Sequence, residues 1–372
     1  MKKKRYICSV EKNVYMKKGF ICLLLIVEGV FLNGSAQEFI WKAGVYNFFD
    51  NNEFANSKVN IPQTMAGVHL TPQIGLKWNE YHRVYAGFDA MHEYGSDNTV
   101  DFFDPIVYYE FFGKPFRFYA GAFPRKLVLD KYPRIFFRDS IDNYRPTVTG
   151  VFWEYYVGET YMNVWLDWVS RQTLARREAF FLGWSGRVNL NLFYGQHFGY
   201  VYHFSNKMDP EIMEGLHDNI LLLTSLGIDL SSKTNFEKLE ANVGWAVGLE
   251  RDRDIEEWHR PQGLLSELIV EYKGLELYNT LYKGNGQQFF HADHGAELYW
   301  GDPMYRTDFY DRADLSVWFY KSDIVKLKMT WSLHFAEQTT YHSQLFTATF
   351  ALDNLHRKSQ KKYRYLWDNW LK

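Results

Sequence analysis

Long stretches of this sequence alternate between apolar residues and polar or small ones, and this period of two constrains the fold more than any other feature. One stretch places apolar residues at every second position from Leu239 to Leu249, and another does so from Val325 to Phe335. Because successive side chains of a strand point to opposite faces, each stretch predicts a β-strand with one apolar face. Typical globular strands have about 5 to 6 residues. These strands are therefore too long for an ordinary β-sandwich.

About sixteen such stretches follow one another along the chain, within a range of 14 to 18. Short turns such as Asn79-Glu80 and Ser185-Gly186-Arg187 alternate with longer polar loops such as 124–147 and 284–308. In lipid every backbone amide must be paired, and only a closed sheet has no unpaired edge. The pattern therefore predicts a closed antiparallel transmembrane β-barrel over residues 37–352, with short periplasmic turns and long extracellular loops.

The first 36 residues form a separate segment. Lys17-Lys18 precede an apolar run that ends at Leu32, and Gly34-Ser35-Ala36 supplies the small residues that a signal peptidase requires. We expect residues 1–36 to be an export signal that is cleaved after Ala36. The alternative, a membrane anchor, is less favoured because the run is short for a spanning helix and contains Glu28.

Composition beyond this segment excludes several classes of function. Seven of the 42 Lys and Arg residues and two of the 44 Asp and Glu residues lie in the first 36 positions, so residues 37–372 carry a net charge of −7. This charge argues against a nucleic-acid partner. Both cysteines, Cys8 and Cys22, also lie in the leader, which excludes disulfides, Cys-ligated zinc and Cys nucleophiles elsewhere. The many Tyr and Trp residues are typical of the aromatic girdles of a membrane barrel.

In this pattern the chain resembles the Gram-negative porin-like outer-membrane barrels over about residues 38–352. A feature of that family is a last strand with alternating apolar residues, and Phe346, Ala348, Phe350 and Leu352 match it. The chain then departs from the family pattern, because a basic and aromatic extension, 353–372, follows instead of a terminal aromatic residue. The resemblance implies an outer-membrane location, contact with membrane lipid and insertion by the barrel-assembly machinery. The oligomeric state is left open.

The function that this resemblance implies is passive diffusion of small hydrophilic solutes, which requires no cofactor. The third long loop of such barrels commonly folds inward and narrows the pore, and 124–147 is the third long loop here. Its six bases and three acids would then favour anions. The constriction candidates are Arg125, Lys126, Lys131, Arg134, Arg138, Arg145, Asp139 and Asp142, and the lumen-wall candidates are Glu240, Asn242, Glu250, Lys326 and Lys328. The alternative is a solvated outer loop.

A metal site is a weaker candidate. His291, Asp293 and His294 offer imidazole and carboxylate ligands close together. Their spacing matches no established zinc signature, and the loop is Gly-rich. We therefore expect an ordinary exposed polar loop and no metal.

Catalysis is the last candidate, because a few outer-membrane barrels are lipid hydrolases or acyltransferases that use Ser and His on adjacent strands near the rim. His342-Ser343, and Ser332 with His334, offer those residue types. Neighbouring residues of a strand face opposite ways, so His342 and Ser343 cannot serve each other directly. We expect these side chains to form hydrogen bonds in the lumen, and the chain not to be an enzyme. The alternatives are a barrel enzyme acting on lipid, a surface-exposed binding or structural barrel, and a secreted soluble β-protein.

Overall fold

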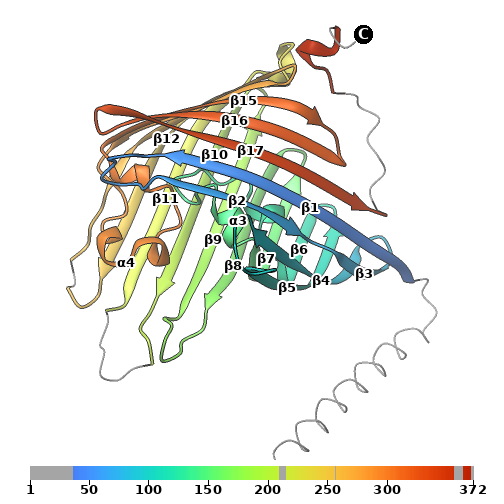
Figure 1. Cartoon of the computed structure of the whole chain (residues 1–372), viewed down its shortest axis with the longest axis horizontal. Coiled ribbons are helices and arrows are strands. Elements are labelled where there is room, and N and C mark those ends of the chain that lie inside the picture. The colour runs from blue at the N-terminus through green and yellow to red at the C-terminus, as the bar shows by residue number, and fades with distance from the viewer. Residues whose placement is uncertain (1–36, 209–214, 256, 356–362, 370–372) are drawn as a thin grey trace, which may run out of the picture.

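The computed structural model describes residues 37–208, 215–255, 257–355 and 363–369. Its strands form one antiparallel sheet that closes on itself (Figure 1). The predicted export signal, 1–36, lies outside the described residues. The strands are β1 (Gln37–Glu53), β2 (Gln63–Leu70), β3 (Gln73–Trp78), β4 (His82–Glu93), β5 (Phe102–Gly113), β6 (Phe116–Pro124), β7 (Thr147–Val157), β8 (Thr160–Ser170), β9 (Ala179–Leu190), β10 (Phe193–Phe204), β11 (His217–Asp229), β12 (Lys238–Asp252), β13 (Gln262–Tyr272), β14 (Leu275–Gly284), β15 (Phe309–Lys321), β16 (Val325–Ala336) and β17 (Thr339–Asp353).

The barrel has sixteen strands, because β2 and β3 are two parts of one strand. Both parts pair with β1 on one side and with β4 on the other. The break falls at Thr71-Pro72, where proline has no N–H group to donate to the ladder. The expectation of a closed antiparallel barrel with about sixteen strands is therefore confirmed.

Pairing between the first and last strands closes the barrel. β1 and β17 are in register from Lys42 opposite Asp353 to Glu53 opposite His342. Beyond the barrel, the described part of the C-terminal extension returns to the β13–β14 turn. There the Leu366 N–H, in the short helix η3 (Leu366–Asn369), donates to the carbonyl of Lys273 at 3.0 Å.

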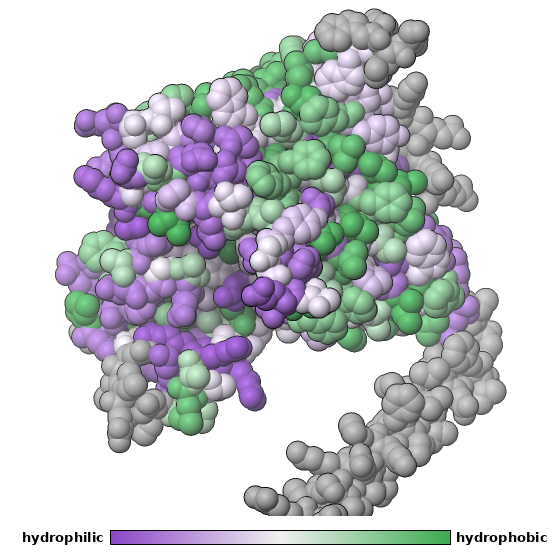
Figure 2. All heavy atoms as spheres, viewed as in Figure 1, coloured by the Kyte–Doolittle hydropathy of each residue, from purple (hydrophilic) through white to green (hydrophobic). Residues whose placement is uncertain are grey.

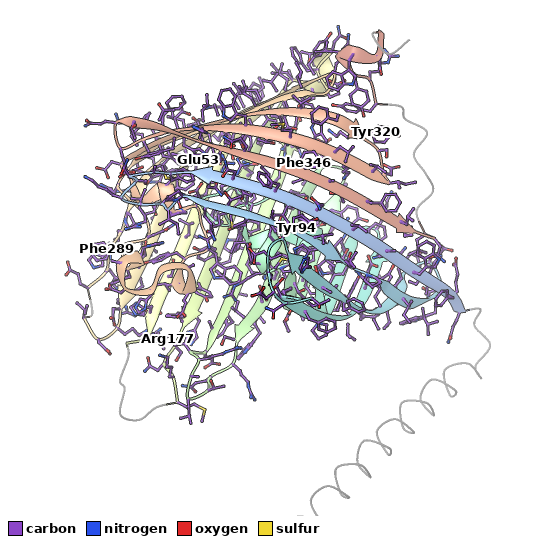
Figure 3. All side chains as sticks on the ribbon, in the orientation of Figure 1. Glu53, Tyr94, Arg177, Phe289, Tyr320 and Phe346 are labelled. Atoms are coloured by element: carbon purple, nitrogen blue, oxygen red, sulfur yellow. The ribbon has the colours of Figure 1, made fainter. Side chains whose placement is uncertain are left out.

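The two faces of the wall follow the alternation in the sequence. Trp245 and Met329 are 47% and 43% exposed on the outer face, whereas Ala246 and Ser332 are buried on the lumen side. Figure 2 shows hydrophobic residues gathered over the strands and hydrophilic residues over the end with the long loops. Figure 3 places Arg177 and Phe289 at that end and Tyr320 toward the opposite one.

One predicted turn is wrong. The sequence Ser185-Gly186-Arg187 continues as strand, with Gly186 paired to His197, and the β9–β10 turn lies instead at Asn191-Leu192. Asn191 has a φ of 60°. Asparagine tolerates this left-handed conformation better than most residues do. A turn-like composition at 185–187 therefore did not outweigh the alternation that runs through it.

Two of the long loops fold into the lumen instead of extending into solvent. The loop 125–146 contains α2 (Lys126–Leu129) and α3 (Ile141–Tyr144), and 285–308 contains α4 (His291–Leu298) and η2 (Pro303–Arg306). The 3₁₀ turn η1 (Ser231–Lys233) lies in the β11–β12 connection. In the described residues, none of the helices has both the length and the apolar character needed to cross a membrane.

Aromatic packing holds both inward loops against the wall. The Trp165 indole N–H, on β8, donates to the Tyr132 hydroxyl at 2.8 Å, and the Phe136 ring packs against Phe198 and Tyr200 on β10. Trp300, from the second loop, is 1% exposed. The expectation that 284–308 is an exposed polar loop is therefore wrong, because its aromatic residues fill the lumen.

The outward face of β12 gives a direct test of the barrel. We expect Trp245→Arg to lower the free energy of unfolding in lipid by about 2–4 kcal/mol, because the charge enters the hydrocarbon near the middle of the strand. Asn242→Arg places the same side chain beside Glu267 in the lumen, and we expect a much smaller loss. Urea unfolding in lipid vesicles measures both changes. Equal losses would contradict this assignment of the two faces.

Candidate active site

The β16–β17 hairpin brings a serine and a histidine together on the lumen face near the long-loop end of the barrel. Ser332 pairs directly with Ser343, and His334 pairs with Tyr341. His334 and Ser343 are therefore diagonal neighbours on the same face. The His334 Nε2 atom lies 3.1 Å from the Ser343 Oγ atom. Both residues are catalytic candidates by sequence, but their pairing across the hairpin is visible only in the structure.

A hydrogen-bonded relay continues from this histidine to a carboxylate. The Tyr310 hydroxyl, on β15, lies 2.8 Å from His334 Nδ1 and donates to Asp302 Oδ2 at 3.2 Å. Since that hydroxyl gives its proton to Asp302, it accepts one from His334 Nδ1. The His334 Nε2 lone pair is then free to accept the proton of Ser343, which is the arrangement that activates a serine nucleophile.

Local sequence explains how the relay is held. Asp302 caps the 3₁₀ turn η2, where its Oδ1 atom accepts from the Met304 N–H at 2.9 Å and Pro303 occupies the first position. The Phe54 ring meets the His334 ring edge-on, with 4.9 Å between centroids.

Burial raises the pKa of Asp302, and the neighbouring Arg312 guanidinium opposes this effect. The four relay side chains, Ser343, His334, Tyr310 and Asp302, are all buried.

An ion cluster lies beside the relay, and we define it as Arg134, Asp139, Arg312 and Asp314. Arg134 bonds to Asp139 at 2.9 Å and to Asp314 at 2.8 Å. Arg312 bonds to Asp139 at 3.0 Å and to Asp314 at 2.7 Å. Burial alone would raise the pKa of Asp139, but the two guanidinium ions outweigh it and hold the pKa well below its usual range. The cluster fastens the loop 125–146 to β15.

Three cavities follow one another through the lumen. The extracellular cavity, of about 550 Å³, is lined by Ser343, His334, Asp302 and Arg138 among others. The periplasmic cavity, of about 580 Å³, is lined by residues that include Glu159. A central cavity of about 220 Å³ shares residues with both. Arg134, Asp139 and Arg312 of the ion cluster are among these shared residues, so the cluster lies between the two larger spaces.

The predicted constriction residues lie in several different environments. Arg125 is buried in an ion pair with Asp167 at 2.7 Å. Lys126 lies over the Tyr46 ring, with Asp142 3.9 Å away. The other predicted residues line cavities: Lys131, Arg134, Arg138, Asp139 and Asp142 line the periplasmic one, and Arg138, Asp139 and Arg145 line the extracellular one.

The predicted lumen-wall residues also differ in their roles. Glu240 and Asn242 line the periplasmic cavity. Glu250 accepts hydrogen bonds from the Gln288 and Phe289 N–H groups at 3.1 and 2.9 Å, and from the Tyr299 hydroxyl, so it anchors the loop 285–308. Lys328 pairs with Glu276 at 2.6 Å, and Lys326 is exposed.

The weak metal candidates lie in α4. His291 stacks on the Tyr299 ring, and the His294 ring lies 4.2 Å from that of His217. Burial lowers the pKa of His291 to about 4, and the positive charges of Arg306 and Arg138 add to this effect. Within the described ranges, no three His, Cys, Asp or Glu side chains approach closely enough to hold a metal ion.

Sequence reasoning missed Tyr310, Arg312, Asp314 and Asp302. The first three occupy alternate positions on the lumen face of β15. Two charged residues inside a predicted membrane strand by themselves indicate a functional site. Asp302-Pro303 is a turn-starting pair. No sequence signal shows that these residues meet His334, because they lie on other strands or loops.

The chain matches one protein family over most of its length. A family model described as lipid A 3′-O-deacylase-type covers residues 33–356. No curated protein matches the sequence significantly. The fold is similar to that of the outer-membrane protein OmpT of Vibrio cholerae, in a mutant that lacks loop L8, with a TM-score of 0.53, 8% identity, and coverage of 85% of this chain and 100% of that one.

Two Pseudomonas aeruginosa structures are also similar. OpdL has a TM-score of 0.51, 11% identity, and coverage of 85% of this chain and 99% of that one. OccK2 (OpdF) has a TM-score of 0.50, 10% identity, and coverage of 86% and 99%. Together with the family match, the fold makes this protein an outer-membrane β-barrel.

The family match overturns one expectation from the sequence. The prediction that the chain is not an enzyme is wrong, because the matched family is an enzyme family. The physical reason for the error lies in the hairpin. His342 and Ser343 are neighbours within one strand and face opposite ways, whereas Ser343 and His334 meet across two strands on one face.

The ion cluster leads to a prediction about stability. Asp314→Asn leaves Arg134 and Arg312 with Asp139 as their only remaining partner in the cluster. We expect the free energy of unfolding to fall by about 3 kcal/mol. Removing one partner leaves buried charges whose desolvation cost is no longer offset. Glu80→Gln, at a residue whose side chain is 84% exposed 3.9 Å from Lys77, should change the free energy of unfolding by less than about 0.5 kcal/mol. Urea unfolding in lipid vesicles compares the two, and similar values would contradict a structural role for the cluster.

Proposed function

We propose that this chain, which belongs to the lipid A 3′-O-deacylase-type family, is an outer-membrane hydrolase that removes an ester-linked acyl chain from a lipid A-type glycolipid. The observation that carries this proposal is the relay Ser343–His334–Tyr310–Asp302 on the wall of the extracellular cavity. The relay supplies a nucleophile, a general base and an orienting acid, which are the groups that ester hydrolysis requires.

The proposed reaction follows from the hydrogen bonds. Ser343 Oγ attacks the ester carbonyl carbon while His334 Nε2 takes the hydroxyl proton. The carbon–oxygen bond to the sugar then breaks, and His334 returns the proton to the departing sugar oxygen. A water molecule attacks the acyl-serine, again with His334 as the base, and releases the fatty acid. Tyr310 and Asp302 hold the ring orientation and stabilise the imidazolium ion in both steps.

The wall restricts how a substrate can reach Ser343. β16, β17 and β1 are hydrogen-bonded to one another along their length, so an acyl chain cannot pass between them. Ser343 lies only a few residues from the Glu337-Gln338 turn at the long-loop end. The ester therefore enters over this rim into the extracellular cavity, from the leaflet that faces the outside.

Removal of the base or the nucleophile tests the proposed reaction. We expect His334→Gln to lower the rate of fatty-acid release by about 10²–10⁴-fold, because general-base catalysis is lost. Ser343→Ala should lower the rate at least as much. Mass spectrometry of lipid A from cells that express each variant measures the release.

The matched control for these variants is His342→Gln. This residue is the same in type and is adjacent in sequence, but it is exposed outside the lumen face. We expect it to keep the full rate. Normal release by a folded Ser343→Ala protein would remove Ser343 from the mechanism.

A second candidate function is the passive diffusion of small hydrophilic solutes. The observation that favours it is the series of three cavities along the lumen, which share residues of the ion cluster in the described part of the chain. In this function the charged residues of the loop 125–146 would select the solute by sign. Arg134 and Arg138 line the path, whereas Arg125 is buried away from these cavities.

The channel proposal has its own test. Replacing Arg134 and Arg138 together by Gln should shift the reversal potential in a salt gradient toward cation selectivity, because a narrow path screens charge less than bulk water does. Arg171→Gln, at an exposed position on another loop, should leave the reversal potential unchanged. Planar-bilayer recordings of the purified chain measure both. Wild-type protein without single-channel conductance would rule out this second function.

A further inference from the structure

The extracellular cavity contains two arginines whose positive charges are not neutralised by the protein. Arg138 and Arg145 both line this cavity, as does Ser343. Neither guanidinium group has a carboxylate within 4 Å among the described residues, in contrast to Arg134, which contacts two, and Arg312, which contacts three. The Arg138 Nε atom is buried and has no hydrogen-bond partner.

Trp300 contacts both residues, although neither guanidinium group is paired with a carboxylate. The Arg138 N–H donates to the Trp300 carbonyl at 2.8 Å, and the Arg145 guanidinium lies 4.8 Å from the centre of the Trp300 ring. Trp300 therefore fixes the Arg138 backbone and the Arg145 guanidinium group. Burial lowers the pKa of Arg138; Asp302 opposes this effect and the charge of Arg145 adds to it. Like charges that are kept close together without counter-ions carry a cost, and a negatively charged ligand relieves it.

Guanidinium chemistry indicates the kind of ligand. Arginine presents a planar fork of N–H donors that matches a phosphate or carboxylate with two parallel hydrogen bonds. Asn52, Asn60 and Gln63 line the same cavity and offer neutral donors for the remaining oxygens. The cavity volume of about 550 Å³ is within the range of small-molecule sites.

We propose that Arg138 and Arg145 form a phosphate-binding subsite, which holds a phosphate ester of the substrate while its acyl ester lies at Ser343. The role in substrate positioning rests on the proposed hydrolase function, whereas phosphate binding itself does not. The subsite assigns specificity to the loop 125–146, because both arginines belong to it. It also explains why that loop is fastened by the ion cluster, since a subsite must keep a fixed distance from the nucleophile.

Binding experiments on the mature chain in detergent test the subsite, with Ser343→Ala as the background so that no probe is consumed. The probes are inorganic phosphate, glucosamine 1-phosphate, and a diacylated glucosamine glycolipid with and without its phosphate. We expect each of Arg138→Gln and Arg145→Gln to weaken the binding of the phosphorylated glycolipid by about ten-fold or more. Arg138→Lys should restore part of the affinity, because it keeps the charge and loses the fork.

The control is Arg171→Gln, which removes the same charge from an exposed loop and should leave the affinity unchanged. Migration of unboiled protein on a detergent gel verifies that each variant is folded. If the two soluble probes bind with the same arginine dependence, the subsite recognises phosphate by itself. If only the glycolipid does so, the phosphate is that of a lipid headgroup. Both results support the subsite.

Two results would overturn the subsite: equal affinity for the phosphorylated and dephosphorylated glycolipids, or unchanged affinity in folded Arg138→Gln and Arg145→Gln. Kinetics separate this proposal from the hydrolase function. In the protein with Ser343 intact, we expect the two Gln variants to raise KM about ten-fold with a smaller change in kcat. Arginine-dependent phosphate binding by a wild-type protein that releases no fatty acid would refute the hydrolase and leave the subsite standing.

Discussion

Closure of the backbone hydrogen-bond ladder is the constraint on which the rest of this structure depends. In a bilayer the unpaired edge of a sheet has no water to bond with, so β1 and β17 must meet and the sheet must become a cylinder. A cylinder has an outside and an inside, and each strand presents one face to each. The lipid then requires an apolar outer face, while the lumen is free to hold charged and catalytic groups.

The lumen of this barrel is filled mainly by its own loops. A sixteen-stranded wall is wide enough for an aqueous channel, but here the loops 125–146 and 285–308 turn inward and bury aromatic side chains against β8–β10. What remains open is a series of cavities with charged residues in their lining, and the ion cluster lies between the two larger ones. The chamber at the extracellular end holds the Ser343 relay, and an enclosed chamber of this kind is what the proposed hydrolysis requires.

Particular residues show how far sequence reasoning reaches. The alternation around Trp245 and Met329 predicts their outward faces, because the period of two is a local property of the strand. The same reasoning places Ser343 and His334 on lumen faces. It cannot pair them, because their meeting depends on the hairpin register, and a shift of one residue would send one of them into the lipid. Tyr310 and Asp302 are further removed still, since they come from β15 and from a loop that packs inside the barrel.

The sequence by itself therefore determined the class of fold, the approximate number of strands and the outward side of the strands with the clearest alternation. Tertiary structure alone decided that two loops enter the lumen, that Arg125 is buried in a pair while Arg138 and Arg145 line a cavity, and that a serine meets a histidine. The physical reason is range. Strand periodicity depends on residues two positions apart. An active site depends on contacts between residues that are distant in sequence and meet only when the barrel closes.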